Sequence, residues 1–206
     1  MAKKALFLTL FLLPNLLWSA LGDLPVTYDY EKGQQVMQVY QKPAILTFVA
    51  SGDCPWSERL LGEVFQEDQF VRAIGNEFLF IAIDFPLENR QSREQIELNH
   101  SLKSTYEIDT FPTMVMIAPS GEEITRLSFP AHGGEAFAKV LRSFYGDYLD
   151  LLAQAEILEV NPKRKAIEKA YERALSLQTP SLIDRFMSLG LEQRQKGYFL
   201  VEQYIA

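Results

Sequence analysis

Cysteine is the scarcest informative residue in this sequence, because Cys54 is the only one among 206 residues. A single cysteine cannot form a disulfide within its own chain, and it offers no spaced set of thiolates for a structural metal. The two histidines, His100 and His132, are not spaced with Cys54 as metal ligands would be. We therefore predict no metal and no cofactor. Cys54 is then a small buried hydrophobe, an intermolecular link or a reactive thiol.

Positive charge is also in short supply, with 20 Lys and Arg against 27 Asp and Glu and a formal net charge of −7. The longest basic run, Lys163-Arg164-Lys165, lies at a predicted helix start, and we interpret it as a solvated surface. Binding to a phosphate backbone requires clustered Lys and Arg. The composition therefore argues against a nucleic-acid partner.

The first residues differ from the rest of the chain. Two lysines precede the apolar run 5–18, and Ala20-Leu21-Gly22 follows it, which is the pattern of a secretory signal peptide. The alternative is an uncleaved membrane anchor, because the run approaches the length that spans a bilayer. Pro14, Asn15 and the small residues at the end favour cleavage. We predict that residues 1–22 are a signal peptide, that the mature protein is periplasmic or secreted, and that it meets the membrane only through this segment.

The stretch around Cys54 carries the strongest local signals. Residues 44–50 are apolar and β-prone, with the length of a buried strand. Ser51-Gly52-Asp53 interrupts this strand, and Pro55 suits the first position of a helix because its missing N–H would have no partner there. Cys54 therefore falls at or next to a helix N-cap, where the terminal N–H groups and the helix dipole favour a thiolate. We interpret Cys54 as an accessible, reactive thiol.

The patterns that follow Cys54 predict an α/β unit. A helix is expected from Cys54 to about Ile74, and residues 78–85 are apolar on both faces, as a central parallel strand is. Two parallel strands need a crossover helix of this kind. The other expected elements are a helix over 30–40, a helix over 92–106, strands over 114–118 and 122–129, and a helix from about Glu135 to Tyr148.

From about residue 149 to residue 206 the sequence predicts only helices. Asn161-Pro162 and Thr179-Pro180 each resemble an N-cap followed by proline at the first helical position. Apolar residues recur on one face of each of the two helices that follow, and they include Tyr171 and Phe186. One helical pair is too little for an independent repeat array. We interpret residues 149–206 as a helical extension packed on the main domain or on a partner.

The order of these elements resembles the thioredoxin-like family over about residues 28–145. In the exported members that it resembles most, Lys-Pro opens the first core strand and Glu-Val-Phe continues the active-site helix, as Lys42-Pro43 and Glu63-Val64-Phe65 do here. The resemblance implies an α/β thioredoxin-like fold, with a central mixed sheet flanked by helices, over residues 23–148. The helical extension over residues 149–206 would follow it.

The resemblance also implies a set of site residues. Cys54 matches the first cysteine of the family's Cys-x-x-Cys motif, and Pro112, preceded by Phe111, matches its cis-proline. Ser57 occupies the position of the second cysteine, so the family's dithiol cycle does not carry over unchanged. Trp56 and Phe111 would offer apolar surface to an unfolded substrate. Ser57 could still donate a hydrogen bond to the sulfur and stabilise its anion.

Two further departures bear on the reactivity of the thiol. Phe48 stands where many thioredoxins bury an acidic residue, six positions before the first cysteine. Asp53 and Glu58 flank the site, and their charges are expected to raise the pKa of Cys54 against the effect of the helix terminus.

Two functions are compatible with these patterns. The first is an exported thiol–disulfide oxidoreductase or isomerase with Cys54 as nucleophile, whose mixed disulfide is released by the substrate's own thiol or by a small thiol such as glutathione. Its partners are exported proteins with thiols or disulfides, together with a small-thiol or redox partner. The second is a redox-inactive binding or chaperone-like module that uses the C-terminal helices, including Tyr171 and Phe186. We favour the first.

Overall fold

The computed structural model describes residues 26–88, 91–127, 129, 133–193 and 196–205. The signal peptide predicted for residues 1–22 lies outside these ranges, and so does His132. Within them, no helix is both long and apolar enough to cross a membrane.

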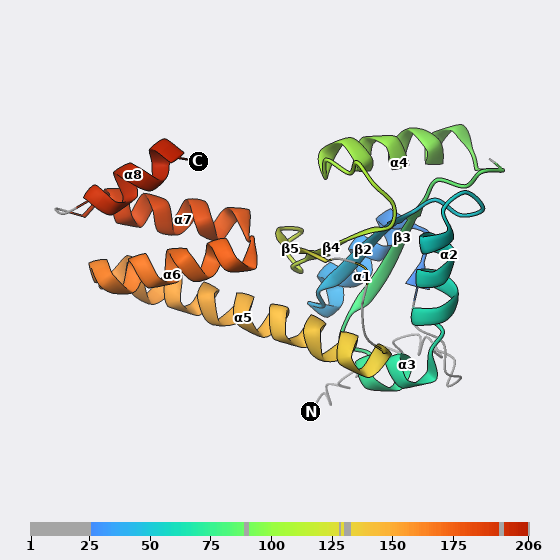
Figure 1. The fold of residues 1–206 in the computed structure, drawn as a ribbon, viewed down its shortest axis with the longest axis horizontal. Helices are drawn as coiled ribbons and strands as arrows, with labels where there is room; N and C mark the ends of the chain where they lie inside the picture. Colours follow the sequence, from blue (N-terminus) through green and yellow to red (C-terminus); the bar gives the residue numbers. More distant parts are fainter. Residues whose placement is uncertain (1–25, 89–90, 128, 130–132, 194–195, 206) are drawn as a thin grey trace, which may run out of the picture.

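A mixed sheet of five strands forms the centre of the molecule (Figure 1). Its spatial order is β1-β3-β2-β4-β5, in which β1, β3 and β2 are parallel, while β4 is antiparallel to β2 and β5 to β4. The central position of β2 places the residues that follow it, including Cys54, at the middle of one sheet edge. The strands are β1 (Val26–Thr27), β2 (Ala44–Val49), β3 (Leu79–Asp84), β4 (Thr113–Ile117) and β5 (Glu123–Leu127).

Helices cover both faces of the sheet. Successive side chains of a strand point to opposite faces, and the apolar side chains on each face pack against helices. Leu46 and Val115 pack in the cluster that includes residues of α1 and α4, whereas Ile45 and Met114 pack in the cluster that includes residues of α3 and α5. This is the central mixed sheet flanked by helices that the sequence predicted. The helices are α1 (Tyr30–Tyr40), α2 (Pro55–Arg59), the π-helix η1 (Leu60–Val64), α3 (Asp68–Ile74), α4 (Arg93–Thr105) and α5 (Gly134–Val160).

The single long helix predicted after Cys54 is divided into three parts. α2 passes directly into the π-helical turn η1, and the chain bends before α3 begins. At this bend the Glu67 carboxylate accepts a hydrogen bond from the Gly134 N–H at 2.7 Å, which ties the bend to the start of α5. A Cβ at Gly134 would lie 2.4 Å from the Cβ of Phe70, so only glycine permits this approach.

α5 continues through the boundary predicted between residues 148 and 149 and carries the chain into the C-terminal helices (Figure 1). The predicted helix start at Asn161-Pro162 is wrong, because Asn161 is the C-cap of α5 and α6 begins at Arg164. Proline shortly after a helix end is common, since it cannot continue the helix. The remaining helices are α6 (Arg164–Leu177), α7 (Pro180–Leu191) and α8 (Gly197–Ile205).

Thr179 is the N-cap of α7 and Pro180 occupies its first turn, as predicted. The Thr179 hydroxyl does not cap the helix, however. It is buried and donates a hydrogen bond of 2.6 Å to the carbonyl of Ile124 in β5. The start of α7 is thereby fixed to the outermost strand of the sheet.

The helical extension and the sheet share one hydrophobic core. A contiguous cluster of buried residues includes Ile45 and Phe80 in the sheet as well as Phe186 and Phe199 in the last helices. Tyr171 is 2% exposed and Phe186 is 0% exposed. The hypothesis that these two residues form a partner-binding face is therefore wrong, because their side chains pack inside the chain's own core.

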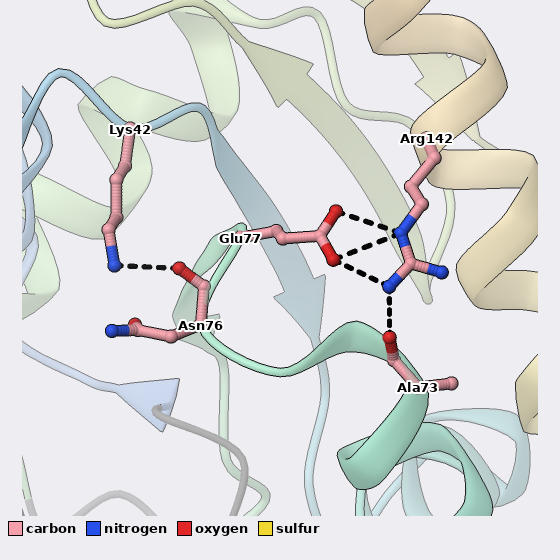
Figure 2. Close-up of polar contacts among 5 residues, drawn as sticks. All are labelled: Lys42, Ala73, Asn76, Glu77 and Arg142. Carbon is pink, nitrogen blue, oxygen red and sulfur yellow. Dashed lines mark hydrogen bonds and ion pairs between the residues drawn. The ribbon is translucent and has the colours of Figure 1, made fainter.

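A polar clamp fixes α5 to the connection between α3 and β3 (Figure 2). The Nε atom of Arg142 lies 2.8 Å from Oε2 of Glu77, and its guanidinium also donates to the carbonyl of Ala73. Lys42 donates a hydrogen bond of 2.6 Å to the carbonyl of Asn76 in the same connection. Lys42 precedes β2 and Cys54 follows it, so this clamp lies at the end of the sheet remote from the thiol.

Candidate active site

Cys54 is the N-cap residue of α2, just beyond the carboxyl end of the central strand β2. The turn before it uses Gly52 with a φ of 75°, a left-handed conformation that glycine adopts without strain. The Cys54 N–H donates to the carbonyl of Ala50 at 3.0 Å, which closes this turn, and Pro55 occupies the first turn of α2. The N-cap placement predicted from the sequence is confirmed.

Two carboxylates hold the loop that precedes Cys54. Asp84 accepts hydrogen bonds from the Ser51 N–H at 3.0 Å and from the Ser51 hydroxyl at 2.6 Å. Glu58 accepts one from the Gly52 N–H at 2.7 Å. Sequence reasoning missed the contribution of Asp84. The feature that could have predicted it is the pairing of the parallel strands β2 and β3, in which Asp84 lies opposite the last residue of β2.

Ser57 supports the thiolate form of Cys54. Its hydroxyl oxygen is buried and accepts a hydrogen bond from the Ala50 N–H at 3.1 Å, which leaves its own O–H available as a donor. Hydrogen bonding from this hydroxyl is the main reason that the pKa of Cys54 lies below its ordinary value. The N–H groups of Ser57 and Trp56 at the helix start lower this pKa further.

Other influences oppose ionisation of the thiol. Partial burial and the negative charge of Asp53 raise the pKa of Cys54, but the net direction is downward. The sequence predicted that Glu58 would also raise this pKa, but Glu58 does not contribute to the shift. Its carboxylate instead accepts a hydrogen bond from the Gly52 N–H. The Cys54 thiol also donates to the carbonyl of Phe111 at 3.4 Å. Only the protonated sulfur can make this bond, so it favours the neutral form.

The structure brings together residues that are far apart in the sequence. The contact between Cys54 and Phe111 joins the end of β2 to the loop before β4, and the Phe111–Pro112 peptide bond is cis. Cys54, Ser57, Phe111 and Pro112 therefore occupy one small region. Their catalytic roles remain predictions.

An aromatic pair lies on the α2 side of this region. Trp56 is 53% exposed, and its ring meets that of Phe129 edge-on at 5.4 Å between centroids. The Arg59 guanidinium lies 5.0 Å from the centroid of Trp56. This is a cation–π distance.

A second aromatic pair lies on the α4 side, where Phe111 packs against Phe85 at 5.1 Å between centroids. The Lys103 ammonium lies 5.3 Å from the centroid of Phe111. The sequence singled out Trp56 and Phe111 through the family motif. Phe85, Lys103 and Phe129 carry no local signal, because they reach the site only through the fold.

No cluster of three or more His, Cys, Asp or Glu side chains in the described ranges is arranged to hold a metal ion. His100 instead packs its ring against Phe85, with 5.4 Å between centroids.

Comparison with known proteins places these features in context. Residues 30–144 match a protein-family model described as a thioredoxin-like domain. The disulfide bond reductase DsbH of Chlamydia pneumoniae is 31% identical over 102 residues, which cover 50% of this chain and 61% of DsbH. The thioredoxin-related protein DsbJ of the same organism is 23% identical over 186 residues, which cover 85% of this chain and 50% of DsbJ. The chain thus spans between half and two thirds of the length of these relatives.

A solved structure of a DsbH oxidoreductase superposes with a TM-score of 0.55 at 27% sequence identity. The superposition covers 60% of this chain and 86% of that structure.

Proposed function

The chain belongs to the thioredoxin-like family, and from this premise we propose that it is a thiol–disulfide oxidoreductase or isomerase of exported proteins with Cys54 as its single nucleophile. The observation that carries the proposal is the position of Cys54 at a helix N-cap, beside Ser57 and Phe111, with a lowered pKa. The printed names of the relatives, a disulfide bond reductase and a thioredoxin-related protein, support the same class of chemistry.

In the first step, the Cys54 thiolate attacks one sulfur of a substrate disulfide. A bond forms between Cys54 and that sulfur, the substrate's own S–S bond breaks, and the other substrate sulfur leaves as a thiolate that takes a proton from solvent. The hydrogen bond from Ser57 stabilises Cys54 as the attacking thiolate and again when it leaves. Trp56, Phe111 and Pro112 would contact the polypeptide next to its disulfide.

Release requires another thiol, because Ser57 cannot form the second disulfide. If a thiolate of the substrate attacks the mixed disulfide, Cys54 is regenerated and the substrate is isomerised without net oxidation or reduction. Alternatively, one small thiol such as glutathione displaces the substrate thiol and stays on Cys54, and a second removes it as the small-thiol disulfide. The substrate then gains the two electrons and two protons that the small thiols lose.

The predicted signal peptide over residues 1–22 supports a periplasmic or secreted location, where substrate disulfides are common. Residues 23–148 would form the thioredoxin-like domain, and residues 149–206 the helical extension. The competing hypothesis of a redox-inactive binding module loses its proposed binding face, because Tyr171 and Phe186 are buried.

The direct test uses the mature chain, from residue 23, and a protein with scrambled disulfides in a glutathione buffer. Wild type should accelerate recovery of the native substrate, and Cys54→Ser should reduce recovery to the rate of the buffer alone. Alkylated wild type is the matched control, because the chain holds no other cysteine. Undiminished turnover by Cys54→Ser would contradict the proposal.

Ser57→Cys tests the monothiol step itself. A second thiol three residues after Cys54 allows release within the chain, so reduction of protein disulfides driven by dithiothreitol should become faster than in wild type. Ser57→Ala is the matched control, since it removes the hydroxyl without adding a thiol. If Ser57→Cys is no faster than Ser57→Ala, release from Cys54 is not the step that limits the wild-type chain.

A further inference from the structure

Lys103 of α4 places a positive charge over the ring of Phe111, the residue whose carbonyl contacts the candidate thiol. Its ammonium lies 5.3 Å from the ring centroid of Phe111 and 6.0 Å from that of Phe85, and the Phe111 carbonyl is 3.4 Å from Sγ of Cys54. No carboxylate of the residues that the structure describes lies within ion-pair distance of Lys103. An anionic group that approaches Cys54 from this side would therefore find a cation that is not paired with any of the described carboxylates.

A small cavity lies next to Phe85, one ring of this aromatic pair. It has a volume of about 210 Å³, and Phe85, Pro86, Ile96 and His100 are among its lining residues. Sites for small molecules usually measure ~300–1,000 Å³, so this cavity suits one side chain better than a whole ligand. His100 and Lys103 are three residues apart on α4 and therefore face the same way. Phe85 is the residue that the cavity and the Lys103 ammonium share.

The α2 side carries the opposite charge. The cation on this side, Arg59, is already paired, because its Nε lies 3.0 Å from Oε2 of Glu63. Asp53 and Glu58 are both exposed and add two further carboxylates next to Cys54. Negative charge therefore lies next to Cys54 on the α2 side, whereas on the α4 side the Lys103 ammonium lies over the aromatic pair.

We propose that the α4 side is a subsite for an acidic residue of the substrate polypeptide, close to its reacting cysteine. Lys103 is the charge partner, and the Phe85 and Phe111 rings form the apolar floor. The acidic residue fixes the direction in which the polypeptide crosses Cys54, since the carboxylates of the α2 side repel it. This inference rests on the proposed function and adds a substrate class to it, a polypeptide with a carboxylate on one side of its cysteine.

The test uses short peptides with one cysteine, activated as a disulfide with the neutral leaving group 2-thiopyridone. The peptides differ only in carrying Glu, Gln or Lys just before the cysteine, or the same residues just after it. Attack by Cys54 forms the Cys54–peptide disulfide and releases one thiopyridone, which is followed by absorbance. At one of the two peptide positions, either just before or just after the cysteine, the mature wild-type chain should react fastest with the Glu peptide, more slowly with the Gln peptide and most slowly with the Lys peptide.

At low ionic strength we expect up to about a fivefold difference between Glu and Gln, since an exposed ion pair contributes up to about 1 kcal/mol. High salt should reduce the difference by screening. Lys103→Met and Lys103→Gln should remove the preference, and Lys103→Glu should reverse it. Lys165→Met, at an exposed lysine of α6, is the control and should keep it.

Two outcomes would contradict the proposal in distinguishable ways. If all peptides react with Cys54 but show no charge preference, or if Lys103→Met retains the preference, the subsite is wrong and the nucleophile stands. If the wild-type chain releases thiopyridone no faster than Cys54→Ser, the proposed function itself fails, and the subsite fails with it.

Discussion

The surroundings of Cys54 and the helices α6 and α7 use large apolar residues in opposite ways. Beside the thiol, Trp56 is 53% exposed, and it is held by Phe129 and Arg59 rather than covered. In α6 and α7, Tyr171 and Phe186 are fully covered. Apolar residues at helical spacing in α6 and α7 form internal packing, whereas Trp56 stays exposed next to the polar turn before Cys54, where we propose that a substrate binds.

The two regions are nevertheless parts of one packed body. α5 packs against α3 and β5 and also against α6 and α7, and the cluster of buried residues that includes Ile45 of β2 also includes Phe199 of α8. The extension therefore packs against the sheet that carries Cys54 at its edge.

The largest effect is expected from a substitution that removes buried side-chain packing from the extension, and it tests whether the two regions unfold together. Phe186→Ala should lower the free energy of unfolding by about 3–5 kcal/mol, because it opens a cavity in the shared core. Trp56 is the only tryptophan after residue 22, so its fluorescence reports on the surroundings of the thiol. Urea unfolding followed by Trp56 fluorescence and by far-ultraviolet ellipticity should shift to the same extent. A fluorescence transition that stays at the wild-type midpoint would mean that the extension unfolds independently.

A smaller effect is expected where the extension meets the edge of the sheet. Thr179→Val keeps the shape of the side chain but leaves the buried carbonyl of Ile124 without its donor, which should cost about 1–3 kcal/mol in urea unfolding. Thr179→Ser is the matched control, because it retains the hydroxyl and loses only a methyl group. Equal or greater stability of Thr179→Val relative to Thr179→Ser would show that the hydrogen bond contributes nothing.

The smallest effect belongs to the clamp in Figure 2. The side chains of Arg142 and Glu77 are 40% and 48% exposed, so Arg142→Met should cost no more than about 1 kcal/mol. The hydrogen bond from Arg142 lowers the pKa of Glu77 from 4.5. The contribution is therefore present near neutral pH and is lost as the pH falls through the lowered pKa. Wild type and Arg142→Met should converge in stability in acid; a constant difference would point to packing by the arginine stem.

The strand, turn and helix around Cys54 could be predicted because each signal acts locally. Gly52 provides the left-handed turn and Pro55 begins the helix. Ser57 follows Cys54 by three residues, almost one helical turn, which places its hydroxyl within hydrogen-bonding reach of the sulfur. Pro112 was identified from the family motif rather than from its neighbours. These residues define the reactive group but not what surrounds it.

The rest of the site depends on the assembled fold. Asp84 lies next to the loop before Cys54 because it is paired with the last residue of β2 in the sheet. The Lys103 side chain extends from α4 over the ring of Phe111. The π-helical turn after α2 was missed because apolar spacing near the helical period does not distinguish a continuous helix from one with an added residue per turn. Asn161-Pro162 was misread because the same pair fits the end of one helix as well as the start of the next.

The measurement that tests the central claim most directly is the pH dependence of Cys54 alkylation. The thiolate is the reacting form, so the midpoint of the rate against pH reports the pKa of Cys54. We predict a lower midpoint for the folded mature chain than for the same chain unfolded in urea, and a rise toward the unfolded value in Ser57→Ala. A folded midpoint at or above the unfolded one would contradict the account, because Cys54 would then be an ordinary thiol on a thioredoxin-like scaffold.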